Sequence, residues 1–192
     1  SPLDIDIRKV SHVLLSAPPN EVGDPVLEIF NDLISRAQNL KWVGYLSTTG
    51  VYGDTKGAWV NENTPPNPQQ ERSIRRFSCE KQWLETKLPV QILRLPGIYG
   101  PGRSAFESLL TGTVKMVDKP GQVFSRVHVD DIAGAVLFLI NLYSQGKNPS
   151  VVNIADNLPT NNLEVIAFAA KLAQKSLPST VSFEIAKKSM SP

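Results

Sequence analysis

The sequence predicts an α/β protein built on a parallel, doubly wound sheet, and two observations lead to this fold class. Short apolar runs alternate with longer segments whose apolar residues recur at helical spacing, which is typical of successive βα units. The apolar runs are also nearly continuous, as expected of strands that helices cover on both faces. With 192 residues, of which 41% are hydrophobic and 20% charged, the chain is long enough for one such domain or most of one.

Four apolar runs are expected to form parallel strands in one sheet. Two of the runs stop at proline, at Pro18 and Pro96, which favours the end of a strand. The predicted strands are residues 12–17, 42–47, 90–95 and 151–155. Ligands of such sheets bind beyond the carboxyl ends of the strands. The candidate ligand-binding edge therefore comprises residues 16–19, 47–50 and 96–98.

Two amphipathic helices are expected near residues 25–38 and 70–87. Asp24 supplies a cap for the first helix, and Pro25 suits its first position. In the second helix, the apolar stripe expected to face the sheet comprises Ile74, Phe77, Leu84 and Leu88. Charged side chains on the same helix are assigned to a solvated face: Arg72, Arg75, Arg76, Glu80, Lys81 and Glu85.

The second half of the chain gives weaker signals. A helix is expected over residues 130–140, with Asp130 as its cap. Asn161 and Glu164 resemble a capping box at the start of a further helix. The tail from Lys175 carries little pattern.

Charge and cysteine content exclude several classes of function. The net charge is +2, and no block of like charges suggests nucleic-acid binding. No apolar run approaches membrane-spanning length, so no membrane association is expected. Cys79 is the single cysteine, which excludes an internal disulfide and is compatible with the cytoplasm. His128, Asp130 and Asp131 lie at a strand-to-helix junction, where capping is a better interpretation than metal binding, and no metal site is expected.

Three motifs carry a resemblance to a known family. They are Leu-Ser-Thr-Thr-Gly-Val-Tyr-Gly at residues 46–53, Arg-Leu-Pro-Gly-Ile-Tyr-Gly at 94–100, and Arg-Val-His-Val-Asp-Asp-Ile-Ala at 126–133. In this order, the chain resembles NAD(P)-dependent epimerases/dehydratases of the extended short-chain dehydrogenase/reductase superfamily, above all atypical bacterial members. The resemblance covers about residues 12–173. It implies a Rossmann-like fold and an NAD or NADP cofactor in the complete protein.

The chain departs from this family at its start. Such folds open with a strand, a G-x-G-x-x-G turn and a helix whose amino end holds the pyrophosphate. No such turn precedes Ser47. We therefore interpret residues 1–192 as the central and C-terminal part of a Rossmann-like domain that is incomplete at the N-terminus. The substrate-side region is expected mainly from residue 97 onward.

The resemblance also suggests individual site residues. Thr48 stands where the family's hydroxyl bonds the substrate oxygen, although a hydroxyl at a strand end can equally cap free backbone groups. Arg103 follows a glycine at the expected pocket mouth, where it would meet an anionic substrate or simply be solvated.

Two short segments fall where the family's chain passes its cofactor. The expected cofactor-binding residues are Ser16, Ala17, Pro18, Pro96, Gly97 and Ile98. In the family, the first three would lie near the ribose and nicotinamide, and the last three near the nicotinamide amide. Proline and glycine suit such positions, since they end strands and let the backbone approach a ligand. Simple strand termination is the alternative interpretation.

The catalytic tyrosine and lysine of the family are missing. Alignment places Ser73 and Phe77 where these two residues would stand, one helical turn apart. No tyrosine occurs between Tyr52 and Tyr99 that could replace the missing one. Tyr52 and Lys56 formally match the Y-x-x-x-K spacing, but they lie in a glycine-containing turn where this spacing does not bring side chains together.

Two functions are compatible with this pattern. The first is an oxidoreductase or epimerase/dehydratase that acts on a small carbonyl, alcohol or sugar-nucleotide substrate without the usual Tyr–Lys pair. The second is a non-catalytic NAD(P)-binding regulator or sensor, because fold alone does not decide function. The family also suggests a homodimer through helices 25–38 and 70–87. Trp83 and Ile34 would be buried in that interface, or would pack on their own sheet.

Overall fold

The computed structural model describes residues 6–186 and divides the chain into two compact units. We describe each unit by itself. The first unit comprises residues up to 55, 59–95 and 132–154, and the second comprises residues 56–58, 96–131 and those from 155 onward.

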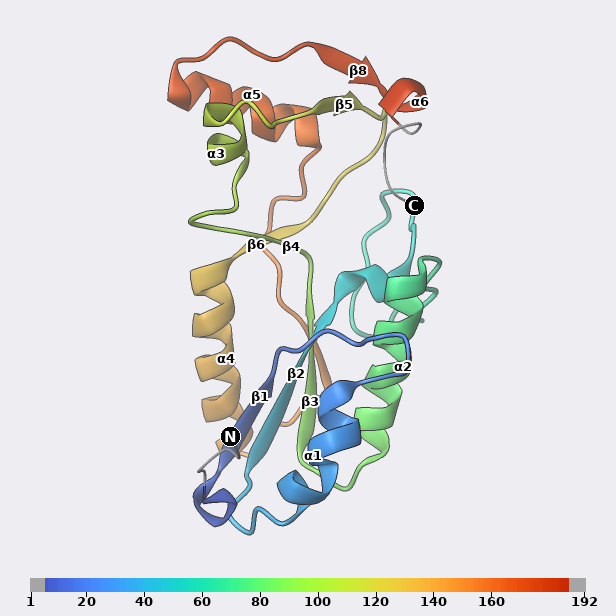
Figure 1. Cartoon of the computed structure of the whole chain (residues 1–192), viewed down its shortest axis with the longest axis vertical. Coiled ribbons are helices and arrows are strands. Elements are labelled where there is room, and N and C mark those ends of the chain that lie inside the picture. The colour runs from blue at the N-terminus through green and yellow to red at the C-terminus, as the bar shows by residue number, and fades with distance from the viewer. Residues whose placement is uncertain (1–5, 187–192) are drawn as a thin grey trace. The chain divides into compact units, whose positions relative to one another are not determined.

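The first unit contains one four-stranded parallel sheet (Figure 1). Its strands are β1 (His12–Leu15), β2 (Trp42–Thr48), β3 (Val90–Leu95) and β7 (Val151–Asn153), hydrogen-bonded in the order β1-β2-β3-β7. The four predicted strands in one parallel sheet are thus confirmed, although β1 and β7 end two residues earlier than expected. A one-turn 3-10 helix, η1 (Ile7–Lys9), precedes β1, and another, η2 (Thr49–Tyr52), follows β2.

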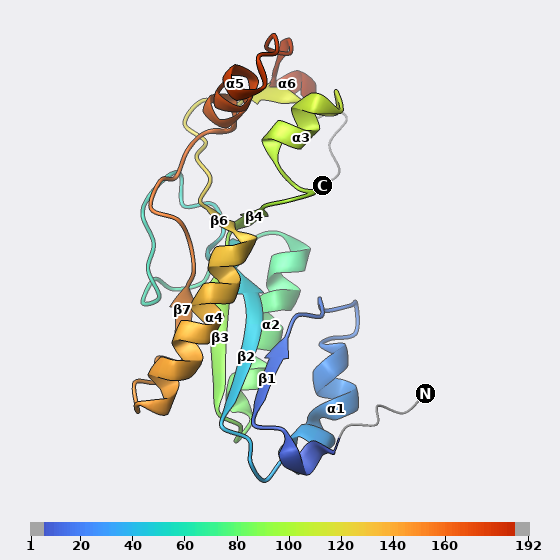
Figure 2. The same cartoon turned by 90° about the vertical axis from the view of Figure 1, so that its left-hand side faces the viewer.

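Helices cover both faces of this sheet, which makes it doubly wound. α1 (Pro25–Ser35) and α2 (Glu71–Glu85) lie on one face, and α4 (Val129–Ser144) lies on the other (Figures 1 and 2). The Asp24 side chain accepts hydrogen bonds from the backbone N–H groups of Val26 and Leu27, so the predicted cap is confirmed. α4 begins at Val129, and Asp130 therefore lies inside its first turn rather than at the predicted cap.

A buried apolar cluster lies between the sheet and the two helices α1 and α2. It comprises Leu15, Ile34, Val43, Tyr45, Cys79, Trp83, Val90 and Ile92. Trp83 is 0% exposed and Ile34 5% exposed, and Trp83 Nε1 donates to Asp24 Oδ2 at 3.0 Å. The suggestion that these two residues form a dimer interface is therefore wrong. Both are used inside their own unit, because each points from its helix toward the sheet.

The apolar stripe predicted for this segment is wrong at Ile74 and Leu84, whereas Leu88, which follows α2, packs against the buried cluster. Ile74 and Leu84 are 49% and 41% exposed. The residues of α2 that are buried are Ser73, Cys79, Glu80 and Trp83. Helical periodicity misassigned this face because it assumes that apolar residues point inward. Here a carboxylate points inward and finds a partner on the sheet.

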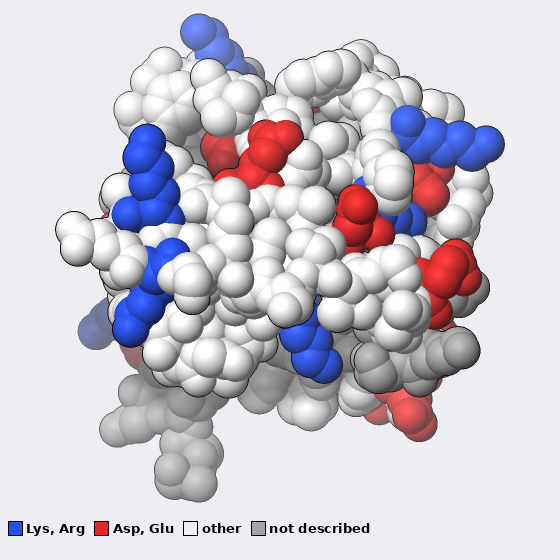
Figure 3. Space-filling model, turned by 90° about the horizontal axis from the view of Figure 1, so that it is seen from above, with Lys and Arg blue, Asp and Glu red and all other residues white. Residues whose placement is uncertain are grey.

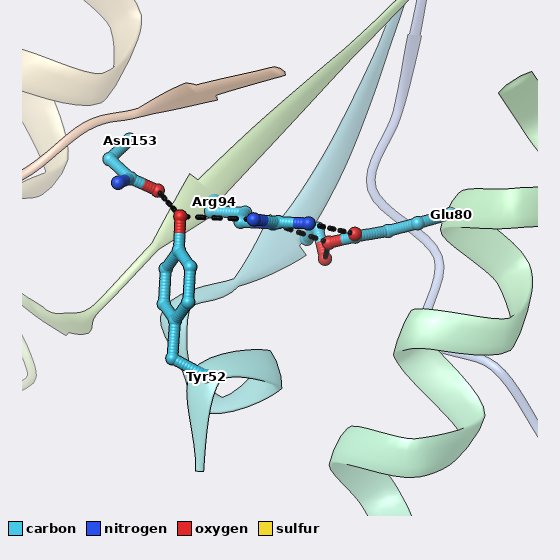
Figure 4. Close-up of polar contacts among 5 residues, drawn as sticks. Tyr52, Glu80, Arg94 and Asn153 are labelled. Atoms are coloured by element: carbon cyan, nitrogen blue, oxygen red, sulfur yellow. Dashed lines mark hydrogen bonds and ion pairs between the residues drawn. The ribbon is translucent and has the colours of Figure 1, made fainter. Parts of the chain in front are cut away.

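That partner is Arg94 on β3, at the centre of a buried polar network (Figure 4). Arg94 donates from Nε to Glu80 Oε1 at 3.1 Å, from Nη2 to Glu80 Oε2 at 2.7 Å, and from Nη1 to Tyr52 Oη at 2.9 Å. Tyr52 Oη donates to Asn153 Oδ1 at 2.8 Å, and Ser47 Oγ donates to Glu80. Burial opposes the charge of Arg94, but the bonds to Glu80 and Tyr52 outweigh it and raise its pKa. The network joins α2, η2 and strands β2, β3 and β7.

The second unit is built from short elements. β4 (Gly97–Tyr99) pairs in parallel with β6 (Arg126–His128), and β5 (Met116–Asp118) pairs in parallel with β8 (Thr180–Ser182). Its helices are α3 (Ala105–Leu110), α5 (Asn162–Ala173) and α6 (Phe183–Ala186). A small core joins α3, β5 and α5 through Leu109, Met116, Ile166 and Ala170.

Sequence patterns found few of these elements. The capping box is confirmed, since the Asn161 side chain accepts from the Glu164 backbone N–H at 2.8 Å. β8 and α6 lie in the tail from Lys175, where little structure was expected. Strands of three residues are too short to show a period in the sequence. Whether such a segment forms a strand therefore depends on pairing with a distant strand.

On the face in Figure 3, basic and acidic side chains are interspersed, and no large area of one sign is visible. Within residues 6–186, no helix combines the length and apolar character needed to cross a bilayer.

The close contact between Trp42 and Gly44 on β2 leads to a stability prediction. A β-carbon at Gly44 would lie 2.1 Å from the Trp42 ring, which is buried and held by a hydrogen bond from its Nε1 to Gln91. We expect Gly44→Ala to lower the free energy of unfolding by about 1–3 kcal/mol, because the ring must shift within a packed core. Urea denaturation followed by circular dichroism measures this. Gly134→Ala on α4, where a β-carbon meets nothing, is the control and should be neutral or stabilising. Equal stability of the two variants would contradict the prediction.

The buried ion pair leads to a second prediction. Glu80→Leu should lower the free energy of unfolding by about 3–5 kcal/mol, because Arg94 would keep its charge in the core without a partner. The double variant Glu80→Leu/Arg94→Met should lose less free energy of unfolding than Glu80→Leu, because no unpaired charge remains in the core. Glu71→Leu breaks an exposed pair with Arg75 and should cost at most about 1 kcal/mol. Denaturant titrations measure these differences. If Glu80→Leu lowers the free energy of unfolding no more than Glu71→Leu does, the Glu80–Arg94 pair does not stabilise the first unit.

Candidate functional site

Thr48 ends β2 at the carboxyl edge of the first unit's sheet. Its Oγ1 accepts a hydrogen bond from the backbone N–H of Gly50 at 3.0 Å. The capping role that the sequence left open is therefore present. It does not exclude a second role, because a hydroxyl that accepts one hydrogen bond can still donate its proton to another oxygen.

Gly50 shows how closely α2 approaches this strand end. A β-carbon at Gly50 would lie 2.8 Å from Ser73 Oγ and 3.3 Å from Thr48 Oγ1. Two hydroxyl groups, one from β2 and one from α2, thus flank the same small space beside a residue that has no side chain. Ser73 is 4% exposed, and Thr48 is half-buried.

Arg76 lies three residues after Ser73 on the same side of α2. Its Nη1 donates to the carbonyl oxygens of Ala17, at 3.4 Å, and Leu46, at 3.1 Å. The same Nη1 donates to Tyr45 Oη at 3.2 Å. Burial raises the pKa of the Tyr45 phenol, while the Arg76 charge acts in the opposite direction. Arg76 therefore links α2 to the carboxyl ends of β1 and β2.

The predicted cofactor-binding residues divide between the two units. Ser16, Ala17 and Pro18 follow β1 in the first unit, where the Ala17 carbonyl oxygen already contacts Arg76. Pro96, Gly97 and Ile98 belong to the second unit. Gly97 and Ile98 form part of β4, paired with Arg126 and Val127 of β6.

Arg103 belongs to the second unit and is exposed. Its backbone N–H and C=O both bond to Gly100 in a tight turn, and neighbouring Gly102 donates its N–H to Glu107 Oε1 at 2.8 Å. The Arg103 side chain is exposed to solvent, as expected if this residue is simply solvated. The same exposure leaves it accessible to an anionic ligand.

The residues at the expected Tyr–Lys positions have different surroundings. Ser73 is buried beside Gly50, whereas Phe77 is half-buried, with the Lys81 ammonium 4.5 Å from the centre of its ring. Tyr52 is 4% exposed, and its hydroxyl belongs to the Arg94 network. The Tyr52 hydroxyl therefore has a structural role in that network.

The structure gives other reactive groups packing roles. His128 Nδ1 lies 3.2 Å from the backbone N–H of Asp130 and accepts its hydrogen bond. Cys79 is buried, and burial raises the pKa of its thiol. No cluster of three or more His, Cys, Asp or Glu residues suited to a metal ion occurs in the part of the chain that the structure describes.

Two surface pockets lie away from these residues. One lies in the first unit at the amino ends of β1 and β2, where His12, Lys41, Trp42, Ile140, Tyr143 and Ser144 line it. The other, in the second unit, is lined by residues 117–123 and 161–163. Ligands of parallel sheets bind at the opposite, carboxyl edge, so we do not assign the first pocket to the candidate site.

Arg76 is the site residue that sequence reasoning missed. Its charge placed it on the assumed solvated face of α2, together with Glu80. A helical wheel centred on Trp83 would have found both, because residues 73, 76, 80 and 83 share one face of a helix.

Three relatives place the chain among known proteins. It is 36% identical over 134 residues to Protein YeeZ of Escherichia coli K12, which covers 67% of this chain and 47% of the relative. A conserved protein of unknown function from Silicibacter pomeroyi is 44% identical, with a TM-score of 0.86, over 95% of this chain and 64% of that one. dTDP-glucose 4,6-dehydratase from Bacillus anthracis, solved in complex with NAD, shares the fold at 21% identity and a TM-score of 0.71, over 90% of this chain and 60% of that one.

The chain therefore spans about half the length of its curated relatives and under two thirds of these solved structures. Residues 16–155, which include β2, β3 and β7, match the model of the NAD dependent epimerase/dehydratase family. From this match and the doubly wound sheet, we conclude that the chain belongs to the NAD-dependent epimerase/dehydratase family.

Proposed function

We propose that the complete protein binds NAD or NADP and acts on a small carbonyl, alcohol or sugar-nucleotide substrate. The observation that carries this proposal is the convergence of the Thr48 and Ser73 hydroxyls beside Gly50, at the ligand-binding edge of the sheet. In this interpretation the chain is the central and C-terminal part of the domain. The pyrophosphate-binding turn would come from βα units that precede it, and the substrate side would lie mainly from residue 97 onward.

The residues at this edge suit part of a dinucleotide. Because Gly50 lacks a side chain, α2 packs closely against this strand end and brings the Ser73 and Thr48 hydroxyls to the same edge of the sheet. The guanidinium of Arg76 donates hydrogen bonds, and the carbonyl oxygens of Ala17 and Leu46 accept them. Ribose hydroxyls both donate and accept, so this mixture of groups matches their chemistry.

Thr48 is the residue to which we assign substrate orientation. Gly50 N–H occupies one acceptor position of its oxygen, which leaves the hydroxyl proton free to follow a substrate oxygen between carbonyl and alcohol. The cofactor, when bound, supplies hydride chemistry. Serine and phenylalanine at the Tyr–Lys positions remove a matched proton donor, an effect of about two to four powers of ten in rate. We therefore expect slow turnover.

The second unit would supply the remaining contacts. We assign the backbone of Pro96, Gly97 and Ile98 to the nicotinamide amide, by resemblance to the family. Arg103 is assigned to an anionic group of the substrate, since its side chain is exposed. We further propose that the protein works in the cytoplasm, with which its single, buried cysteine is compatible.

A non-catalytic NAD(P)-binding regulator or sensor is the second candidate. The observation that favours it is the pair Ser73 and Phe77, which provides neither a phenol nor an ammonium group at the positions where the family carries them. A sensor would bind the cofactor tightly, transfer no hydride, and bind a partner only when the cofactor is present.

The cofactor and Thr48 assignments are tested together on the full-length protein. Calorimetry should show binding of NAD or NADP, and absorbance at the nicotinamide band should show slow turnover of a sugar-nucleotide or carbonyl substrate. Thr48→Ala should slow turnover by a further ~10- to 100-fold, because the oriented hydroxyl is lost. Thr49→Ala, one residue further on, is the matched control and should have little effect.

The outcomes separate the candidates. Cofactor binding without turnover would favour the sensor, and the absence of cofactor binding would contradict both. Turnover at ordinary enzyme rates that Thr48→Ala leaves intact would contradict the role of Thr48.

We propose a homodimer through the outer faces of α1 and α2. The residues used cannot be Ile34 and Trp83, but Ile29 and Leu33 on α1 are 67% and 40% exposed. Light scattering should show a dimer of the full-length protein, and Ile29→Glu should convert it to a monomer, because a charge would enter an apolar contact. Glu28→Gln on the same helix is the control. A monomer at high concentration for the unmodified protein would refute this proposal.

A further inference from the structure

The first unit contains two arginine–tyrosine pairs that differ in one respect. Arg94 donates from Nη1 to Tyr52 Oη at 2.9 Å, and Arg76 donates from Nη1 to Tyr45 Oη at 3.2 Å. Each guanidinium also lies near the ring of its tyrosine, at 4.9 Å and 5.6 Å from the ring centre respectively. In the first pair, the Nε and Nη2 atoms of Arg94 hold both carboxylate oxygens of Glu80.

In the second pair, the corresponding edge of Arg76 binds no acid. Among residues 6–186, Arg76 forms no ion pair, and its Nε and Nη2 atoms make no hydrogen bond. Its charge is met by neutral oxygens alone, two backbone carbonyls and one phenol. Asp24, the buried carboxylate of the same core, already accepts from two backbone N–H groups and from Trp83.

This arrangement is electrostatically incomplete. A half-buried guanidinium without a counter-charge is less stable than one paired with an acid, because burial removes part of its hydration. The Nε–Nη2 edge has two parallel N–H groups, and this geometry matches both oxygens of a carboxylate or two oxygens of a phosphate. Arg76 is anchored through Nη1, so this edge is held in one orientation.

The position of Arg76 indicates what supplies the acid. Nη1 reaches the carbonyl oxygens of Ala17, just beyond β1, and Leu46, near the end of β2. This is the carboxyl edge of the parallel sheet, where ligands bind. We propose that the Nε–Nη2 edge of Arg76 binds an anionic group of the ligand, a carboxylate or a phosphate. The inference rests on the proposed function and adds to it a negatively charged ligand group at the ends of β1 and β2.

The anionic group can belong to the cofactor or to the substrate, and paired probes distinguish these sources. Nicotinamide mononucleotide and nicotinamide riboside differ by one phosphate, so they test the cofactor. UDP-glucuronic acid and UDP-glucose differ by one carboxylate, so they test the substrate when NAD is saturating. Inorganic phosphate tests the charge without either molecule.

The experiment measures binding of these probes to the full-length protein by calorimetry. Arg76→Met should lower the affinity for the probe that carries the additional acid group by about 10- to 100-fold, and leave the other member of that pair nearly unchanged. Arg76→Lys keeps the charge but loses the two-pronged geometry. Its affinity for the probe with the additional acid group should therefore lie between those of the unmodified protein and Arg76→Met. Arg72→Met, which removes an exposed arginine one turn earlier on α2, should bind every probe as the unmodified protein does. Circular dichroism and thermal melting confirm that each variant folds.

Each result decides the inference and the proposed function separately. If the dinucleotide binds and Arg76→Met binds both members of each probe pair as the unmodified protein does, the inference is wrong and the proposed function stands. If no dinucleotide binds but phosphate or UDP-glucuronic acid binds in an Arg76-dependent manner, the inference stands and the proposed function fails. If no probe binds, both are overturned. If Arg76→Met does not fold, the result for Arg76→Lys tests the inference. If Arg76→Lys binds the probe with the additional acid group as tightly as the unmodified protein does, two-pronged binding is contradicted.

Discussion

The buried ion pair between Glu80 and Arg94 is the interaction on which the first unit depends. Two charges in an apolar core are tolerated only when their geometry is favourable and their other hydrogen bonds are satisfied. Both conditions hold here, because the contact is bidentate, Ser47 donates to Glu80, and Arg94 donates to Tyr52. Tyr52 continues the network to Asn153 on β7. The pair therefore fixes α2 against three of the four strands and leaves few alternative positions for the helix.

The candidate site is a consequence of this constraint. Ser73 and Arg76 lie two turns and one turn, respectively, before Glu80 on the same face of α2, so fixing Glu80 also fixes them. They meet the sheet where β1 and β2 end, beside Gly50 and Thr48. An ion pair within the fold thus positions groups for a ligand, and the ligand itself need not contact that pair.

The chemistry of the site separates binding from proton transfer. Two hydroxyls, two carbonyl oxygens and a guanidinium can orient a polar or anionic ligand, but none of them is an acid matched to neutral pH. This composition is compatible with a slow enzyme and with a sensor. The relatives are longer than this chain, which spans 47% of one and 64% of another.

The sequence alone determined the four strands, their parallel direction in one sheet, and the caps at Asp24 and Asn161. Those features depend on local patterns, namely apolar runs, turn residues and polar side chains that bond their own backbone. Tertiary structure decided which face of α2 is buried, because a charged residue points inward only when a distant strand offers its partner. It also decided the three-residue strands of the second unit, which exist only through pairing. Tertiary structure also decided the role of Arg76. That role depends on which strand ends its guanidinium contacts, and the periodicity of the sequence does not predict those contacts.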